Sequence, residues 1–407
     1  MTKITLPFIL DGATGTQLQK HGYNNETGTE QWVLEHPNTI QEIQKNYVAA
    51  GSNAVYACTF GANPVKLKDN GIVGQTREYN LKLVELSKQA VDGKAMVAGD
   101  IAPTGKFLVP MGEMTFEELV AVYREQAEAL AEAGVDLFVI ETTMTVPEAR
   151  AAILAVKEVS DKPVLVTFTC DENGKTLTGT DVTAALVILQ SMGADAFGLN
   201  CSVGPDKMLE QLKRLSEYAK VPLIAKPNAG IPDMVDGKAV YHCPPEEFAA
   251  LVPEMAAVGV GIFGGCCGST PEHIAALANA AKSCEIKAPA PQHEDAVVTA
   301  TERKVFVLDD VELGEDYPCD EDIEDVIEEA EDSDEPILCI RMEDEDELEN
   351  FEEAQYSIAK PLCILCEEEA LLEQTLRMYQ GRAMYSGELP AAFLDEMSQK
   401  YGLIVLK

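Results

Sequence analysis

The 407-residue sequence has few basic residues: 31 lysines and arginines stand against 69 aspartates and glutamates, a formal net charge of −38. Binding to nucleic acids and to anionic membrane surfaces depends on clustered lysine and arginine. The sequence therefore predicts neither a nucleic acid nor a membrane as a partner. The shortage is greatest at the C-terminal end, where residues 301–407 contain 32 acidic and 8 basic residues, a net charge of −24.

The chain also lacks long apolar runs, although 46% of its residues are hydrophobic. None approaches the ~18 residues that a membrane-spanning helix requires. No basic segment followed by an apolar one opens the sequence at Met1, as a secretory signal would. Eleven cysteines in so long a chain fit a reducing compartment better than a disulfide framework. We therefore expect a globular, cytoplasmic protein whose thiols are free or bound to a metal.

Short apolar runs alternate with amphipathic segments eight times between residues 8 and 268. We interpret the runs as strands near 8–11, 53–60, 95–101, 137–143, 164–170, 196–201, 223–228 and 261–266. Among the segments between them, 116–133 repeats apolar residues at helical spacing. Eight parallel strands with crossover helices predict an α/β protein in which residues 1–285 form a (β/α)8 TIM barrel. The active sites of such barrels lie at the carboxyl ends of the strands.

Three cysteines follow two of these predicted strands. Cys201 ends the sixth strand, and Cys266 and Cys267 end the eighth, so the barrel places all three at one rim. A disulfide between neighbouring cysteines is strained, which makes a soft metal the better partner for both sulfurs. Three thiolates with one open position are typical of a catalytic zinc site. The residues alone leave open three free buried cysteines, and also other thiols near strand ends, namely Cys58, Cys170 and Cys243.

The segments around these cysteines resemble the two zinc signatures of the homocysteine S-methyltransferase family. They read GLNCSVGP at 198–205 and GGCCGSTPEHI at 264–274. Further similar segments occur in the same order at 10–16, 59–62, 99–105, 140–142 and 226–230. The resemblance covers residues 1 to about 285, and segments 112–116 and 171–174 are most similar to the N-terminal homocysteine-binding module of cobalamin-dependent methionine synthase.

The resemblance implies a role for each rim residue. It implies zinc held by Cys201, Cys266 and Cys267, with Asn228 as a possible fourth ligand when substrate is absent. It implies substrate binding by Asp11, Gly12, Thr59, Glu141 and Asn228, in which Asp11 and Glu141 hold the amino group of homocysteine. The chain departs from the family pattern at Cys58, where relatives commonly have asparagine. His273 follows a helix-capping Ser-Thr-Pro-Glu segment, which favours a structural role.

The activity that follows is zinc-dependent methyl transfer to homocysteine, which gives methionine. The resemblance favours methylcobalamin as the donor, and the chain has no corrinoid-binding segment of the Asp-x-His-x-x-Gly type. A separate corrinoid protein is therefore the expected partner. Two alternatives stay open: a methyltransferase that uses S-methylmethionine or betaine, and a non-catalytic zinc-binding regulatory protein.

The acidic C-terminal part predicts a second, smaller unit. Residues 286–302, with alternating alanine and proline, are interpreted as a linker. Residues 303–407 then predict a small α/β domain with strands near 305–308, 337–340, 361–365 and 403–406. From Lys360 onward the domain resembles a truncated, degenerate pterin-binding barrel, with Leu365-Cys366-Glu367 where relatives have a polar pair. We therefore expect that folate binding is lost, that the acidic run 320–322 is a solvated face rather than a calcium site, and that the domain packs or docks.

Overall fold

The computed structural model describes residues 4–235 and 238–406. It divides into two compact units, of which the first contains Met1–Leu177 and Ala194–Ala290. The second contains Thr178–Gly193 and Pro291–Lys407. The sequence placed 178–193 inside the barrel domain, so the second unit differs from the predicted one in taking a segment from the middle of the chain.

The first unit is built on eight parallel strands in the order β1-β10-β7-β6-β5-β4-β3-β2. Their bounds are β1 Phe8–Ile9, β2 Ala54–Tyr56, β3 Met96–Ile101, β4 Leu137–Thr143, β5 Val164–Phe168, β6 Ala196–Asn200, β7 Leu223–Lys226 and β10 Val260–Phe263. Asn53 joins the two outer strands, since Ile9 N donates to Asn53 Oδ1 at 2.8 Å and Asn53 N donates to Ile9 O at 2.6 Å. The predicted TIM barrel is confirmed.

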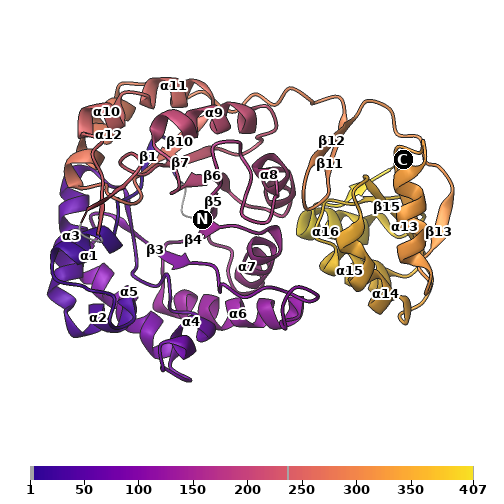
Figure 1. The fold of residues 1–407 in the computed structure, drawn as a ribbon, viewed down its shortest axis with the longest axis horizontal. Helices are drawn as coiled ribbons and strands as arrows, with labels where there is room; N and C mark the ends of the chain where they lie inside the picture. Colours follow the sequence, from indigo (N-terminus) through magenta and orange to yellow (C-terminus); the bar gives the residue numbers. More distant parts are fainter. Residues whose placement is uncertain (1–3, 236–237, 407) are drawn as a thin grey trace. The chain divides into compact units, whose positions relative to one another are not determined.

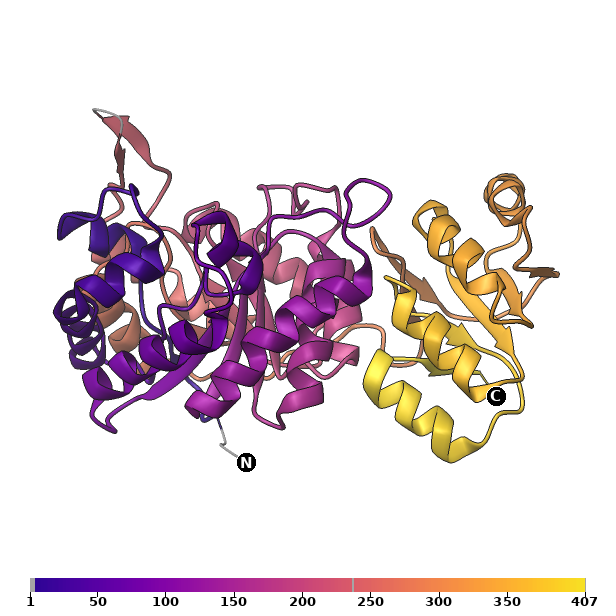
Figure 2. The same ribbon diagram turned by 90° about the horizontal axis from the view of Figure 1, so that it is seen from below.

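Helices surround these strands (Figure 1). In the part of the first unit that the structure describes there are eleven. They are α1 Gly15–Lys20, α2 Thr29–Glu35, α3 Pro37–Ala50, α4 Pro64–Asp69, α5 Thr76–Val91, α6 Phe116–Ala133, α7 Val146–Val159, α9 Pro205–Ser216, α10 Pro245–Ala249, α11 Val252–Ala257 and α12 Pro271–Lys282. Helix α6 spans the predicted range because Thr115 and Glu118 form a capping box at its start and Gly134 ends it in a left-handed conformation. No helix among the described residues is long and apolar enough to cross a membrane. A hairpin of β8 (Asp233–Val235) and β9 (Lys238–Val240) projects after β7 (Figure 2).

The barrel interior has an apolar layer below a polar one. The apolar layer contains Phe8, Leu10, Ala54, Tyr56, Ala98, Leu137, Val139, Leu165, Ala196, Ile224 and Ile262. Side chains alternate along a strand, so residues two positions later face the same interior. Asp100, Glu141 and Lys226 each follow an apolar-layer residue by two positions. The sequence thus places charged groups inside the barrel, at the carboxyl ends of its strands.

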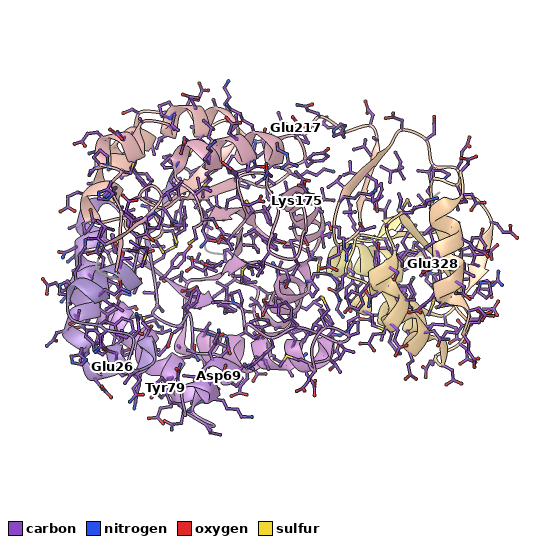
Figure 3. All side chains as sticks on the ribbon, in the orientation of Figure 1. Glu26, Asp69, Tyr79, Lys175, Glu217 and Glu328 are labelled. Atoms are coloured by element: carbon purple, nitrogen blue, oxygen red, sulfur yellow. The ribbon has the colours of Figure 1, made fainter. Side chains whose placement is uncertain are left out.

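The second unit has a five-stranded parallel sheet in the order of the chain, β13-β14-β15-β16-β17. The strands are β13 Asp316–Pro318, β14 Leu338–Met342, β15 Leu362–Cys366, β16 Met384–Tyr385 and β17 Ile404–Val405, joined through α13 Ile323–Asp332, α14 Glu347–Ala354, a 3-10 turn at Gln355–Ser357, α15 Glu369–Met378 and α16 Ala391–Tyr401. Right-handed crossovers between successive strands place these helices on one face of the sheet. The helices carry many acidic side chains, including the exposed Glu328 of α13 (Figure 3).

An antiparallel hairpin of β11 (Val297–Ala300) and β12 (Val305–Leu308) completes the second unit. Val297 and Leu308 pack against the sheet residues Cys339 and Cys363. Strand β11 lies within the segment predicted as a linker, so regular structure begins before residue 303. The hairpin also packs against α8 (Val182–Ser191), and Asp181 N, just before that helix, donates to Arg303 O at 3.0 Å.

Candidate metal and substrate site

The structure brings together the three cysteines that the sequence singled out. The Sγ atoms of Cys201, Cys266 and Cys267 all lie within 4.8 Å of one another, and those of Cys201 and Cys267 are 4.0 Å apart. Tetrahedral zinc with bonds of about 2.3 Å separates thiolate sulfurs by about 3.8 Å. The three thiols therefore fit a zinc ion with little movement. Among the described residues no other cysteine, histidine, aspartate or glutamate group forms such a cluster.

The backbone around these thiols is held tightly. Cys201 and Ser202 have φ values of 62° and 60°, in the left-handed region that residues other than glycine rarely adopt. Cys266 N donates to Pro227 O at 2.8 Å, and Ser269 Oγ donates to Cys266 O at 2.8 Å. Left-handed residues persist where the surroundings hold them, and they are common at functional sites. The two strand ends thus present their thiols in a fixed arrangement.

The three thiols differ in pKa. Hydrogen bonds from Cys266 and then Cys267 lower the pKa of Cys201. The pKa of Cys266 is raised, first by its hydrogen bond to Cys201, and the same partner raises the pKa of Cys267 to about 11. One thiolate is thereby stabilised by two neighbouring thiols, and Asn228 also donates a hydrogen bond to Cys201. Asn228 is buried and its Oδ1 atom has no hydrogen-bond partner, which fits its predicted place beside the metal.

The thiols open into a cavity of about 280 Å³ at the carboxyl ends of the strands. Its lining consists of Gly12 to Thr16, Thr29, Glu30, Tyr56, Ala57, Cys58, Phe60, Asp100, Glu141, Thr142, Cys201, Lys226, Gly265, Cys266 and Cys267. Gly12 is required here, because a Cβ atom would lie 2.7 Å from Tyr47 Oη and 2.8 Å from Ser269 Oγ. The predicted residues Gly12 and Glu141 therefore share a cavity with all three cysteines.

A buried lysine contacts the acidic side chains at this end of the barrel. Lys226 Nζ lies 3.2 Å from Glu141 Oε2, 4.0 Å from Asp11 Oδ1 and 3.5 Å from the centre of the Tyr56 ring. Burial alone lowers the pKa of Lys226, but Glu141 and the other acidic groups outweigh it and raise that pKa. Lys226 is therefore a permanent cation, 3% exposed, that neutralises part of the surrounding negative charge.

Asp11 is buried and does not line the cavity. Its Oδ2 accepts a hydrogen bond from Tyr56 N at 2.8 Å, and its other oxygen faces Lys226. Burial raises the pKa of this carboxyl to about 7, more than Lys226 lowers it. In the structure Asp11 therefore contacts Lys226 and the backbone of β2.

The Asp11 carboxyl predicts a pH-dependent stability. A folded-state pKa of about 7 exceeds the unfolded value of 3.8, so the native state binds the proton more tightly. Its contribution to the free energy of unfolding is present below about pH 4 and is lost as pH rises through 7, by up to ~4 kcal/mol. We expect Asp11→Asn to flatten the dependence between pH 5 and 8 in urea unfolding with chelator present. The exposed control Asp161→Asn should keep the wild-type slope, and equal slopes for all three proteins would contradict this account.

Thr59 does not occupy the position that the sequence predicted. Strand β2 ends at Tyr56, and a turn follows in which Thr59 N donates to Ala57 O at 2.7 Å. The Thr59 hydroxyl donates to Asp100 O at 2.8 Å and accepts from Asp100 N at 3.1 Å. Its hydrogen-bonding capacity is thus used by the backbone of β3, and it does not line the cavity. In this structure Thr59 holds the backbone of Asp100 in place.

The remaining candidate residues have distinct places. His273 caps α12, with Nδ1 2.9 Å from Thr270 Oγ1 and Nε2 2.8 Å from Cys243 O, so its predicted structural role is confirmed. Cys58 lines the cavity but is not part of the thiol cluster. Cys170 and Cys243 neither line the cavity nor belong to the cluster.

Sequence reasoning missed Asp100, Lys226 and Tyr56 as parts of this site. The signal for the two charged residues was present, because each lies within the last residues of a buried strand, as Glu141 does. Tyr56 gave no such signal, since an aromatic residue in an apolar strand is ordinary core.

Comparison with known proteins identifies the family. The family model described as homocysteine S-methyltransferase matches residues 8–281. The chain belongs to the homocysteine S-methyltransferase family. Members named methionine synthase from Mycobacterium tuberculosis (strain ATCC 25618 / H37Rv) and Mycobacterium leprae (strain TN) are 33% and 32% identical to it over 300 and 292 residues.

These alignments cover 69% and 67% of this chain but 25% and 24% of the relatives, so the chain spans about a quarter of their length. The homocysteine methyltransferase MmuM from Escherichia coli, solved in a metallated form, is similar in structure. It has a TM-score of 0.58 and 26% identity over 67% of this chain and 95% of that one. The family match and this likeness both concern the barrel, in which the thiol cluster lies.

Proposed function

We propose that this chain is a zinc-dependent homocysteine S-methyltransferase that makes methionine with a methyl group from a methylated corrinoid carried on another protein. The observation that carries the proposal is the cluster of three thiols within 4.8 Å at the wall of a cavity that also contains Glu141. Three thiolates leave one position of a tetrahedral zinc ion open for a substrate sulfur.

The residues of the chain would divide the work as follows. Cys201, Cys266 and Cys267 would hold zinc, which when bound keeps a substrate thiol in its nucleophilic thiolate form at neutral pH. Glu141 faces the same cavity and would accept hydrogen bonds from the substrate amino group. Gly12 lines the cavity, and its backbone N–H would donate to the substrate carboxylate. Asn228, beside Cys201, would approach the metal when substrate is absent.

The size of the cavity bears on the donor. About 280 Å³ suits one small amino acid and leaves no room for a corrinoid beside it. A corrinoid would have to present its methyl group from outside, bound to its own protein. S-methylmethionine is the second candidate, because it is small enough to approach the same cavity as a free molecule.

A comparison of donors tests the function. Purified protein would be given homocysteine with a methylated corrinoid protein, free methylcobalamin, S-methylmethionine or betaine in separate reactions, and methionine would be measured. We expect the corrinoid donors to give the fastest formation. Faster reaction with S-methylmethionine or betaine would replace the donor assignment, and no methionine with any donor, from protein that contains stoichiometric zinc, would favour a binding or regulatory role.

We propose that the acidic second unit docks a basic protein partner. With a net charge of −24 over residues 301–407 it creates a long-range field that attracts a basic surface. We expect the rate with a methylated corrinoid protein to fall about 10-fold or more between 50 and 500 mM salt, whereas the rate with free methylcobalamin stays nearly constant. An equal salt response with both donors would show that the charge serves only solubility. Tight methyltetrahydrofolate binding by the unit would overturn the proposed loss of its folate site.

A further inference from the structure

Asp100 is a buried carboxylate of the cavity that the function described above does not use. It lies near the end of β3, is 5% exposed and lines the cavity with Glu141 and Lys226. Its Oδ1 atom is buried and has no hydrogen-bond partner. Buried polar atoms are nearly always satisfied, so an unpaired oxygen on a carboxyl group that lines a substrate cavity indicates a partner that arrives with the ligand.

The backbone of Asp100 is fixed from two sides. Thr59 accepts from its N–H and donates to its carbonyl, and Gln126 Nε2 donates to the same carbonyl at 3.3 Å and to Thr59 O at 2.8 Å. Asp100 pairs with Val139 in the parallel register of β3 and β4. Glu141, two residues after Val139, therefore faces the barrel interior on the same side. The two carboxylates are held on adjacent strands above the same apolar layer.

The carboxyl groups at this end of the barrel outnumber the cations beside them. Asp11, Asp100 and Glu141 face a single cation, Lys226, which contacts Asp11 and Glu141. Among the described residues no ion pair within 4.0 Å reaches Asp100, and burial, together with the charge of Glu141, raises its pKa well above the usual value. The carboxylates are also too far apart to form a metal-binding group with one another. A cation that pairs with Asp100 would therefore have to arrive with the ligand.

We propose that Asp100 binds the α-ammonium group of the substrate together with Glu141, and so selects amino thiols over thiols that lack the amino group. The inference rests on the proposed function of the same cavity. Lys226 holds one oxygen of Glu141 at 3.2 Å, and Glu141 itself lines the cavity. An arriving ammonium gives the Asp100 carboxylate the cation that the protein does not supply, and a charge-assisted hydrogen bond in a buried site is stronger than a neutral one.

The test is the Asp100→Asn variant, which keeps the shape of the side chain and removes its charge. Steady-state kinetics would be measured with homocysteine and with 4-mercaptobutanoate, the same thiol without its amino group. We expect the KM for homocysteine to rise about 10- to 100-fold with kcat changed less than about 3-fold, as loss of one charged hydrogen bond predicts. The KM for 4-mercaptobutanoate should stay the same or fall. Zinc content should equal that of wild type, and the exposed control Asp92→Asn should match wild type with both thiols.

Equal changes in both KM values would show that Asp100 has only a structural role, and an unchanged KM for homocysteine would overturn the proposal. Calorimetric binding of the two thiols to zinc-loaded wild type and variant separates this claim from the proposed function. If wild type turns over neither thiol yet binds homocysteine more tightly than 4-mercaptobutanoate, and Asp100→Asn removes that preference, the amino-group claim stands while the methyltransferase proposal fails. If the preference is absent in wild type or kept in the variant, the amino-group claim fails.

Discussion

Replacing Cys266 by alanine should remove stoichiometric zinc and lower methyl transfer to homocysteine by about 10³-fold or more. Cys266 is one of three thiols whose Sγ atoms lie within 4.8 Å of one another, and its pKa is raised first by its interaction with Cys201. Two thiolates and a gap would leave zinc weakly held, and the loss of activation by a metal is worth several kcal/mol in the transition state. Metal analysis and methionine formation, measured on the same preparation, would report both effects.

A nearby cysteine outside the cluster supplies the control. Cys243 is partly buried, and its thiol donates to Pro244 O at 3.7 Å rather than to the cluster. Cys243→Ala should keep one zinc per chain and the wild-type rate. Normal methyl transfer and full zinc content in Cys266→Ala would refute the metal site, whereas loss of zinc in Cys243→Ala would mean that the cluster has a different third or fourth member.

Replacing Lys226 by methionine should cost more stability than any surface change in this chain. The substitution conserves most of the side-chain volume but removes the one cation among Asp11, Asp100 and Glu141. Breaking a buried ion pair by removing one partner typically costs about 3 to 5 kcal/mol, because the other charge stays buried. We expect a decrease of that size in the free energy of unfolding, measured by urea denaturation at pH 8.

The size of this effect should depend on pH. Lys226 lowers the pKa values of Asp11 and Asp100, so its removal raises them further. Carboxyl groups with raised folded-state pKa values lower the free energy of unfolding as pH rises. The stability lost in Lys226→Met should therefore be larger at pH 8 than at pH 5. Lys82→Met is the matched control, since Lys82 is exposed and pairs only with Glu78 on the same helix, and should change stability by less than about 0.5 kcal/mol. A deficit that is equal at both pH values would argue for lost packing in place of lost charge.

The barrel and its thiols could be predicted because they depend on local signals. Most of the apolar runs end where a glycine or polar residue begins a loop, and helix α6 carries both of its end signals in its own sequence. The position of Cys201 and Cys266 at strand ends then followed from the common direction of parallel strands. Thr59 could not be placed in this way, because its side-chain direction depends on where β2 ends, and the turn after Tyr56 moved it away from the cavity.

Features that depend on distant partners were not predictable from the sequence alone. Lys226 reads as one polar residue at the end of a strand, and only the fold shows that Asp11 and Glu141, which are 215 and 85 residues away, surround it. Strand β11 lies in a segment of weak pattern and forms because β12 pairs with it. Helix α8 has the sequence of an ordinary barrel crossover helix, and nothing in it announces that its partners include residues beyond 290.

Helix α8 lies in the chain between β5 and β6 but belongs to the second unit. No single cut in the gene therefore separates the two units. A polypeptide that stops at Ala290 would keep the α8 segment but lose β11, β12 and α16, against which that helix packs. A polypeptide that starts at Pro291 would have the opposite defect, a hairpin and sheet without their helix. Fission or shuffling of the acidic unit during evolution would therefore leave apolar surface on each product, and we expect the two parts to be inherited as one reading frame.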